Sequence, residues 1–552
     1  MARIARKSSA PASVKGKFQG EFDVIVVGSG VAGLATALFC CWHGNKVLVL
    51  EKASDLGGTT RKAAFWYWVP NNAAMRAAGT KDPKRDCIRY MARLSRPEVY
   101  NAKAANFGVP EWDYAQYEAI YDNASAATEL LRKKGALEYR HCDFVPDYWA
   151  ELPEDKAPKG RVLLPKDARD TMSDGGEVAV RTMSAAAKRD GIDVRSGHRV
   201  QRVIRNNSRE IIGVETDTAR GKSRFFARKA VVFCTGGFTH DVELRKNYLS
   251  APVYGGCAAR SNEGDFIYIA SALGAQLRNM NYAWMCPIVF EKAIAKDPAL
   301  IGTFSPSGDS MIYVNKEGRR VANEKLAYNE MAQVFFQWDG ARGEYPNLLL
   351  IAIWDQRSQE HSASDEYGRF IVPPGTDDAH VIKGATLAAL SKAIGERLAR
   401  YENATGGLKL APEFEETLAA TIQRFNGFAS IGRDSDFHRG ERQVEVLFNG
   451  SVAPSPSGPN PTMYPISDTG PYYAALLTGG TLDTKGGPKT NVSGQVVDDQ
   501  DKPIAGLYGV GNCVASASAR AYWAGGATIG PILAFAYLAA AAVHHERKKR
   551  AS

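Results

Sequence analysis

The sequence has few cysteines and none of the pairs that hold a structural metal or a redox-active disulfide. Its eight cysteines among 552 residues include no C-x-x-C pair, and Cys40 and Cys41 are adjacent in an apolar stretch. This pattern fits buried free thiols in a reducing compartment better than disulfides or a zinc site. We therefore expect no metal and a cytoplasmic protein.

Long apolar runs are also scarce. The first twenty residues are basic and polar without an apolar core, so they do not resemble a secretory signal. Residues 521–543 carry no charge, but three glycines and Pro531 interrupt them and predict a loop that enters a helix near residue 531. Because a membrane span needs about 20 apolar residues, we expect a buried helix and no stable membrane insertion.

No single patch concentrates the positive charge. Lysine and arginine number 69 against 60 acidic residues, a net charge of +9, and they are interspersed along the chain. The main clusters lie near the ends, at Arg3, Arg6 and Lys7 and at residues 547–550, and such short runs are typical of solvated tails. We therefore expect no nucleic-acid partner. With 45% hydrophobic and 23% charged residues, the composition is that of a globular enzyme.

The N-terminal region contains a β-turn-α-β unit. The pattern predicts a strand over residues 22–27, a glycine-rich turn at 28–33, a helix to about residue 43, and a second strand at 46–50 that ends in Glu51. A lone G-x-G-x-x-G is weak evidence, but here the strands, the helix and the acid are all in place. The glycines allow a tight turn, close approach of the backbone to a pyrophosphate at the helix N-terminus, and helix packing. Glu51 is expected to accept the ribose hydroxyls, and its charge disfavours NADP.

Three further glycine-containing segments favour FAD over NAD. Gly57-Gly58-Thr59-Thr60 suits a loop along the second half of a flavin dinucleotide, and residues 230–237 and 506–512 each predict a strand that ends in a glycine turn. An NAD dehydrogenase needs none of these segments. The residues that we expect to bind FAD are Gly28, Ser29, Gly30, Val31, Ala32, Gly33, Glu51, Lys52, Gly58, Thr59, Thr60, Gly236, Gly511, Asn512, Ala527 and Ile529.

This spread of motifs predicts an α/β fold in several parts, since the chain is too long for one core. It resembles the flavoproteins with two dinucleotide-binding folds, a Rossmann-like FAD-binding domain into which an α+β substrate-capping domain is inserted. We expect a flexible tail at 1–20, the first part of the FAD-binding domain at 21–285, the capping domain at 286–469, and the second part of the FAD-binding domain at 470–552. Within the capping domain the sequence predicts one helix, over residues 385–401.

Several segments resemble the fumarate reductase and 3-ketosteroid Δ1-dehydrogenase group of flavoproteins. Residues 318–328 are similar to the segment of the ketosteroid branch that carries the catalytic-base tyrosine, and residues 144–149 to the segment that carries its supporting tyrosine. Residues 522–526 resemble the tyrosine and glycine that hold the ketone oxygen. Two further segments that match the family pattern are 470–474 and 484–487.

The resemblance implies an enzyme that introduces a carbon–carbon double bond beside a ketone. Tyr522 and the backbone N–H of Gly526 would bind the carbonyl and acidify the α-carbon. Tyr328 would take the α-proton, Tyr148 would lower the pKa of Tyr328, and flavin N5 would accept hydride from the β-carbon. Because a free phenol has a pKa of about 10, Tyr328 must be activated or the reaction must favour alkaline pH.

Fumarate reductases are the nearest alternative. They use an arginine as proton donor about where Tyr328 falls, and Thr478-Gly479-Gly480 lacks the histidine expected before the glycines. A dicarboxylate would then lose its charged partners, so we expect a neutral carbonyl substrate.

The size of the substrate depends on aromatic residues. Trp66 and Trp68 follow the flavin loop, and Trp112, Tyr114 and Tyr117 lie in a segment that looks inserted relative to the ketosteroid enzymes. If these aromatic side chains line the substrate cavity, the cavity is too narrow for a four-ring steroid, and the protein then resembles bacterial cyclohexanone dehydrogenase. The alternative is that the same side chains only pack at the domain interface. The residues that we expect in the pocket are Trp66, Trp68, Trp112 and Tyr472. We expect a small cyclic ketone as substrate and an external electron acceptor, a quinone, a dye-like carrier or oxygen. A 3-ketosteroid dehydrogenase and a flavin-binding sensor without turnover remain the alternatives.

Overall fold

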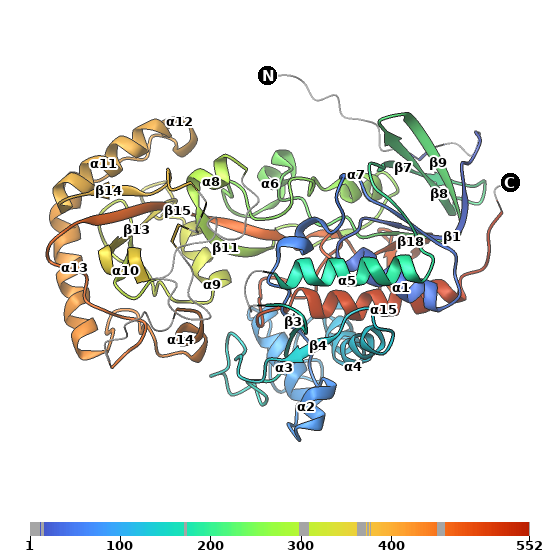
Figure 1. Ribbon diagram of the computed structural model, residues 1–552, viewed down its shortest axis with the longest axis horizontal. Helices are drawn as coiled ribbons and strands as arrows, with labels where there is room; N and C mark the ends of the chain where they lie inside the picture. Colours follow the sequence, from blue (N-terminus) through green and yellow to red (C-terminus); the bar gives the residue numbers. More distant parts are fainter. Residues whose placement is uncertain are drawn as a thin grey trace.

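The computed structural model describes residues 11–12, 16–169, 174–296, 308–361, 371–372, 375, 377–449 and 459–550. Much of the tail expected at residues 1–20 lies outside these ranges. Figure 1 shows one lobe, which contains β1 and α1, on the right and a second lobe on the left. The long strand β15 (Tyr472–Thr484) runs across the middle of the molecule and links the two lobes.

A mixed eight-stranded sheet forms the centre of the first lobe. Its main path has the order β17-β18-β9-β1-β2-β6, and every pairing on this path except β17–β18 is parallel. β7 and β8 extend the sheet from β9 in antiparallel pairs. The strands are β1 (Glu21–Val27), β2 (Val47–Leu50), β6 (Asp193–Arg195), β7 (Arg199–Arg205), β8 (Ile211–Thr218), β9 (Gly221–Phe233), β17 (Gln495–Val497) and β18 (Pro503–Gly509). The predicted Rossmann-like unit is confirmed.

Both faces of the central strands are covered, as a parallel sheet requires. Residues 24–27 of β1 are at most 5% exposed, because helices pack on one face and a second apolar cluster with α7 covers the other. α15 lies between α1 and α4, and it begins close to the residue that the sequence predicts. The helices are α1 (Val31–Trp42), α4 (Glu111–Lys133), α5 (Gly175–Arg189), α7 (Asp265–Ser271) and α15 (Ile529–His545). In the described part of the chain, no helix has the length and apolar surface that crossing a bilayer requires.

The second lobe is built on a five-stranded antiparallel sheet. Its main path is β11-β15-β13-β12, and β14 also pairs with β15. The strands other than β15 are β11 (Ala283–Val289), β12 (Met311–Val314), β13 (Leu350–Asp355) and β14 (Ile382–Gly384). The pairing of β15 therefore carries this sheet past the boundary that we expected at Gly470, to Thr484.

The second lobe holds more helices than the single one that the sequence predicts. That helix is present as α11 (Leu387–Arg400), but α13 (Phe414–Ile431) was missed. Its buried residues Phe414, Leu418 and Ile422 recur at a helical spacing, so the signal was in the sequence. The others are α8 (Phe290–Ile294), α9 (Tyr328–Gln333), η2 (Val334–Phe336), α10 (Gln356–His361), α12 (Glu402–Thr405) and α14 (Gln443–Asn449).

An excursion between β2 and α5 forms a small layer below the first lobe in Figure 1. Its three-stranded sheet has the order β3-β5-β4, with Trp68 on the edge strand β3 and Trp66 directly before that strand. The elements of this layer are η1 (Gly58–Lys62), β3 (Tyr67–Trp68), α2 (Ala73–Ala77), α3 (Lys84–Ser95), β4 (Tyr139–His141) and β5 (Val162–Pro165). The remaining elements are α6 (Val242–Tyr248), β10 (Leu277–Arg278) and β16 (Gly487–Pro488).

Candidate active site

A cavity at the N-terminus of α1 gathers segments that lie far apart in the sequence. The β1–α1 turn, the end of β2, η1, the turn after β9 and the turn after β18 all contribute to its lining. The predicted residues that line it are Gly28, Ser29, Gly30, Val31, Ala32, Glu51, Lys52, Gly58, Thr59, Thr60, Gly236 and Asn512. A cavity with a helix N-terminus at one wall and an acid at the end of β2 fits a flavin dinucleotide.

Not every predicted residue lines this cavity, and some lining residues were missed. Among the described residues, Gly33, Gly511, Ala527 and Ile529 are not part of the lining. Lining residues outside the sequence prediction include His198, Val200, Ser261, Asn262, Asp265 and Asp483. They lie on strands, in turns and, for Asp265, at the start of α7, without a recognisable local motif.

Gly28 shows why the turn needs glycine. Its φ is +104°, a conformation that side chains disfavour, and a Cβ there would lie 2.4 Å from the carbonyl oxygen of Cys234. The tight turn therefore brings β1 against the turn after β9 without a side chain between them.

Glu51 holds the glycine-rich turn in shape. Its Oε2 accepts hydrogen bonds from the Ser29 N–H (2.9 Å) and the Ser29 hydroxyl (2.7 Å), and its Oε1 accepts one from the Ala53 N–H (2.8 Å). The neighbouring Lys52 pairs with Asp265 at 2.8 Å. The carboxylate of Glu51 thus orients the turn in addition to facing the cavity, where we expected it to receive the ribose.

The hydroxyls of the η1 loop are fixed by backbone donors. Thr60 Oγ1 accepts a hydrogen bond at 3.0 Å from the N–H of Val31, the first residue of α1. Thr59 Oγ1 accepts one at 2.9 Å from the N–H of Ala259. These bonds tie the loop to the helix terminus on one side and to the segment after α6 on the other. Both hydroxyls can still donate toward the cavity.

Asp483 on β15 organises the far wall of the cavity. It is buried and accepts hydrogen bonds from the Gly237 N–H (3.0 Å), Asn262 Nδ2 (2.8 Å) and Asn512 Nδ2 (3.1 Å). Burial raises the pKa of its carboxyl, while these donors oppose that shift. Asp483 therefore joins the turns after β9 and β18.

Three tyrosines from separate segments meet beside this cavity. The Tyr148 hydroxyl donates to the Tyr328 hydroxyl at 2.7 Å, and a further hydrogen bond joins Tyr328 and Tyr522. The ring centroids lie 5.1 Å apart for Tyr328 and Tyr522 and 5.5 Å apart for Tyr148 and Tyr522. Tyr148 and Tyr522 are buried, whereas Tyr328 keeps part of its surface accessible. We call these three residues the tyrosine cluster.

Trp284 connects the tyrosine cluster with the cofactor cavity. Its Nε1 donates to Asn512 Oδ1 at 3.1 Å, and Asn512 lines the cavity. The Trp284 ring lies 4.8 Å from the Tyr522 ring. The tyrosine cluster is thus one side chain away from the cavity wall.

Gly526 offers a backbone donor next to the tyrosine cluster. It is buried, and in the described part of the chain its N–H donates to no protein acceptor. Its φ is +85°, and a Cβ would lie 2.4 Å from the backbone carbon of Trp66, so glycine is required. A buried N–H without a partner is costly unless a ligand satisfies it, which fits the ketone-binding role.

The pKa of Tyr328 differs from our expectation. We expected Tyr148 to lower it, but burial raises the pKa of Tyr328 well above the usual range, and Tyr148 and Tyr522 raise it further. The cause is that neither neighbour is a cation, so nothing in the tyrosine cluster offsets the cost of a buried phenolate. The pKa of Tyr522 is also raised, chiefly by burial.

The four predicted pocket residues lie in different places. Trp66 is close to the tyrosine cluster through Phe448, whose ring stacks at 5.7 Å from Trp66 and lies 5.9 Å from Tyr148. Trp68 is completely buried, and its Nε1 donates to a carboxylate oxygen of Asp147 at 3.0 Å. Trp68 therefore supports the segment that carries Tyr148.

The structure does not bring Trp112 and Tyr472 to the tyrosine cluster. The Trp112 indole donates to the Thr490 carbonyl at 2.7 Å and packs under Arg278, so it anchors α4 to the segment that follows β16. Tyr472 lies at the far end of β15, ten residues before Leu482, which packs against the same small apolar cluster as Tyr328. At about 3.3 Å per residue, that separation is roughly 33 Å.

A buried ionic group supports Tyr148. Arg161 is completely buried and pairs with Asp147, with Asp82 at 2.7 Å and with Asp155 at 2.9 Å. Because Asp147 precedes Tyr148, the group fixes the backbone of the Tyr148 segment. The carboxyls of Asp147 and Asp155 have raised pKa values, chiefly through burial.

Removing this arginine should strongly destabilise the protein. We expect Arg161→Met to lower the free energy of unfolding by about 3–5 kcal/mol, because three buried carboxylates lose their counter-charge. Lys166→Met is the control, since its pair with Glu138 is exposed. Thermal denaturation measures both; equal melting temperatures would contradict the role of Arg161.

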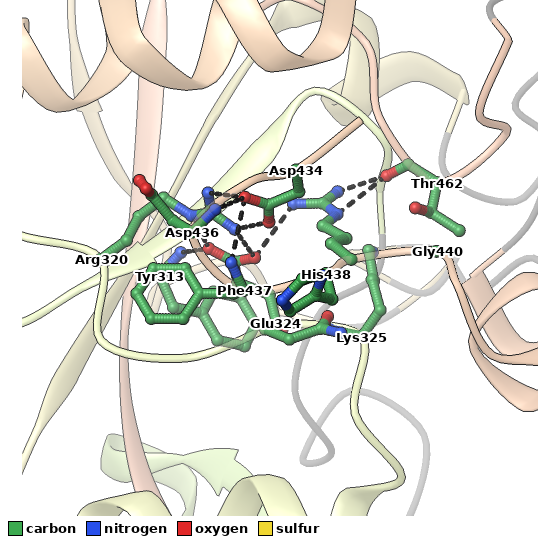
Figure 2. A network of polar contacts seen from close by, with 12 residues as sticks. Tyr313, Arg320, Glu324, Lys325, Asp434, Asp436, Phe437, His438, Gly440 and Thr462 are labelled. Atoms are coloured by element: carbon green, nitrogen blue, oxygen red, sulfur yellow. Dashed lines mark hydrogen bonds and ion pairs between the residues drawn. The ribbon is translucent and has the colours of Figure 1, made fainter. Parts of the chain in front are cut away.

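A second polar network positions the segment that carries Tyr328 (Figure 2). Arg320 pairs with Glu324 and with Asp434, each at 2.7 Å, and the completely buried Arg439 pairs with Glu324 at 3.2 Å. Lys325 donates to the carbonyl of Gly308 at 2.6 Å. The loop before α9 is thereby fixed to the segment between α13 and α14.

The cofactor cavity and the neighbouring tyrosine cluster define an FAD-dependent dehydrogenase that acts on CH–CH bonds. A family model described as FAD binding domain matches residues 23–529, and the chain belongs to this family. It is 31% identical to a 4-oxocyclohexanecarboxylate 2-dehydrogenase of Sinomonas cyclohexanicum, over 94% of this chain and 92% of that protein. It is 28% identical to a 3-oxosteroid 1-dehydrogenase of Mycobacterium tuberculosis, over 96% of this chain and 99% of that protein.

The fold also matches a solved structure. The 3-ketosteroid Δ1-dehydrogenase from Sterolibacterium denitrificans, crystallised with 1,4-androstadiene-3,17-dione, superimposes with a TM-score of 0.77. The match covers 95% of this chain and 99% of that one at 23% identity. The resemblance expected from the sequence is therefore confirmed at the level of family and fold.

Proposed function

We propose that the protein converts a cyclohexanone-like ketone into its 2-enone. The observation that carries this proposal is the hydrogen-bonded tyrosine cluster beside a buried, unpartnered Gly526 N–H and the FAD cavity. Bound FAD supplies the hydride acceptor. The relative from Sinomonas is named for 4-oxocyclohexanecarboxylate, a single-ring ketone that also carries a carboxylate, which supports a single-ring substrate.

The chain's own residues would handle the carbonyl and the proton. The Tyr522 hydroxyl and the Gly526 N–H would donate to the ketone oxygen and stabilise the negative charge that develops on it. Tyr328 would accept the α-proton, since its hydroxyl lies between those of Tyr148 and Tyr522. Tyr148, which donates to Tyr328 in this structure, would hold the Tyr328 oxygen in place.

A neutral ketone suits the site better than a dicarboxylate. The groups around Tyr328 and Tyr522 are aromatic rings, and the Lys485 ammonium beneath Trp284 already donates to the carbonyls of Ala519 and Ala521. No charged clamp for two carboxylates is therefore present among the described residues of the tyrosine cluster. A 3-ketosteroid Δ1-dehydrogenase is the second candidate, favoured by the relative from Mycobacterium tuberculosis; a fumarate reductase-type enoate reductase is the third.

A product assay separates these candidates. The purified holoenzyme is given cyclohexanone, androst-4-ene-3,17-dione or fumarate, with an oxidised dye for the ketones and a reduced dye for fumarate. We expect 2-cyclohexenone from the first and little or no turnover of the other two. Steroid turnover without cyclohexanone turnover would replace the proposal by the second candidate, and fumarate reduction alone by the third.

We further propose a cytoplasmic enzyme that passes its electrons to an external acceptor, a quinone, a dye-like carrier or oxygen. All eight cysteines are free thiols, and seven of them are buried, which supports a reducing compartment. Comparing reoxidation of the reduced enzyme by a soluble quinone and by oxygen would distinguish the acceptors.

A further inference from the structure

Helix α14 closes one side of the tyrosine cluster. Val444, Leu447 and Phe448 share one face of this helix, because residues three and four apart lie above one another. That face packs against the aromatic core that contains Trp66 and Tyr148. In Figure 1 the helix lies between the second lobe and the layer that carries β3.

Phe448 forms a continuous wall with Trp66. The two rings stack with centroids 5.7 Å apart at an interplanar angle of 27°, and Phe448 meets the Tyr148 ring edge-on at 5.9 Å. A further ring between Phe448 and Trp66 would need about 7 Å, twice the contact distance of carbon atoms. A substrate beside Tyr148 is therefore bounded on this side.

The helix is anchored to the segment that carries Tyr328. Glu445 is buried, and its carboxylate accepts hydrogen bonds from Asn323 Nδ2 at 2.9 Å and from the Gly440 N–H at 2.7 Å. Asn323 belongs to the loop that the network of Figure 2 holds in place. The position of α14 relative to Tyr328 is thus fixed by buried polar contacts.

The helix is also anchored to the segment that carries Tyr148. The Gln443 N–H donates to Glu151 Oε1 at 2.9 Å, and the Arg442 guanidinium lies 4.1 Å from the centre of the Trp149 ring. Because Trp149 directly follows Tyr148, both catalytic segments hold the same helix. Helix α14 cannot shift without breaking contacts on one of the two sides.

We propose that Phe448 is a specificity-determining residue that restricts the substrate to a single ring. The inference rests on the proposed function and names the side chain that sets the size of the ketone. A second fused ring on the side of Tyr148 would collide with the wall formed by Phe448 and Trp66.

The test compares ketones of one, two and four rings in the holoenzyme. For Phe448→Ala, the ratio of kcat/KM for 1-decalone to that for cyclohexanone should rise at least about tenfold, a typical effect of space for added methylenes. Androst-4-ene-3,17-dione serves as the four-ring probe. Val446→Ala is the control on the same helix, because Val446 is 37% exposed, and its ratio should not change. Phe448→Leu keeps an apolar filler and should shift the ratio in the same direction by less.

The outcomes separate the inference from the proposed function. If cyclohexanone is desaturated but the ratio is unchanged in both Phe448 variants, with FAD retained, the inference is overturned and the proposed function stands. If the unmodified enzyme desaturates the steroid and no single-ring ketone, both are overturned. Loss of FAD from both variants would show that Phe448 is needed for folding and would also overturn the inference.

Discussion

Tyr328→Phe should lower kcat/KM for cyclohexanone by about 10²- to 10⁴-fold, the usual contribution of a general base. The substitution removes the hydroxyl that lies between Tyr148 and Tyr522 and leaves the ring in its place. FAD should remain bound, because Tyr328 does not line the cofactor cavity. Steady-state rates with a dye acceptor and the visible flavin absorbance measure both quantities.

Tyr345→Phe is the matched control for this prediction. Tyr345 lies in the second lobe, where its ring packs edge-on against Trp338 at 4.9 Å, away from the tyrosine cluster. The Tyr345→Phe substitution also removes one hydroxyl, and it should leave kcat/KM for cyclohexanone unchanged. A near-normal rate in Tyr328→Phe would remove Tyr328 from the mechanism.

The pH profile tests the same residue independently. The pKa of Tyr328 is raised, so only a small fraction of this residue is phenolate at neutral pH. As long as the pH stays below the pKa, this fraction grows about tenfold for each unit by which the pH rises. We therefore expect kcat/KM to rise by up to about tenfold per unit from pH 7 to 10, without a plateau at neutral pH. The residual activity of Tyr328→Phe should lack this slope. A flat profile for the unmodified enzyme would contradict a tyrosine base.

Tyr522→Phe should lower kcat by about 10²- to 10³-fold, the usual effect of losing one donor to a developing oxyanion. The Gly526 N–H remains as the second donor, so KM should change less than kcat. Thr528→Val is the control, because it removes only the 3.5 Å contact of Thr528 with the Tyr522 hydroxyl. Rates of the two variants with cyclohexanone check this, and an unchanged kcat in Tyr522→Phe would contradict the assignment.

The sequence predicts the cofactor cavity well because a Rossmann unit is local. Its turn, helix and acid lie within about thirty residues, so spacing alone brings Gly28 and Glu51 together. Asp483 acts over a long range: it accepts from Gly237 and Asn512, and although it directly precedes the family-matching segment 484–487, that match did not point to a cofactor contact. For the same reason, the boundary expected at Gly470 assigned β15 to a different domain from the strands with which it pairs.

The pocket residues show the limit of aromatic content as a guide. Trp112 and Tyr472 were chosen because aromatic rings suit an apolar substrate, but one is held by Thr490 and the other lies at the far end of β15. Phe448, which does approach Tyr148, comes from a short helix that the sequence did not predict. Tertiary packing decides which aromatic side chains line a pocket.

The direction of the pKa shift of Tyr328 was also beyond the sequence. The family resemblance implied that Tyr148 lowers this pKa, but burial among rings without a cation raises it. The proposed reaction therefore depends on stabilising charge at the ketone oxygen rather than on an acidic Tyr328.

The most direct test is to mix the oxidised holoenzyme with cyclohexanone in the absence of oxygen and of any dye. The visible flavin absorbance should bleach and one equivalent of 2-cyclohexenone should form, and Tyr328→Phe should bleach at least about a hundredfold more slowly. An unchanged flavin spectrum with cyclohexanone and with every other cyclic ketone would contradict the account.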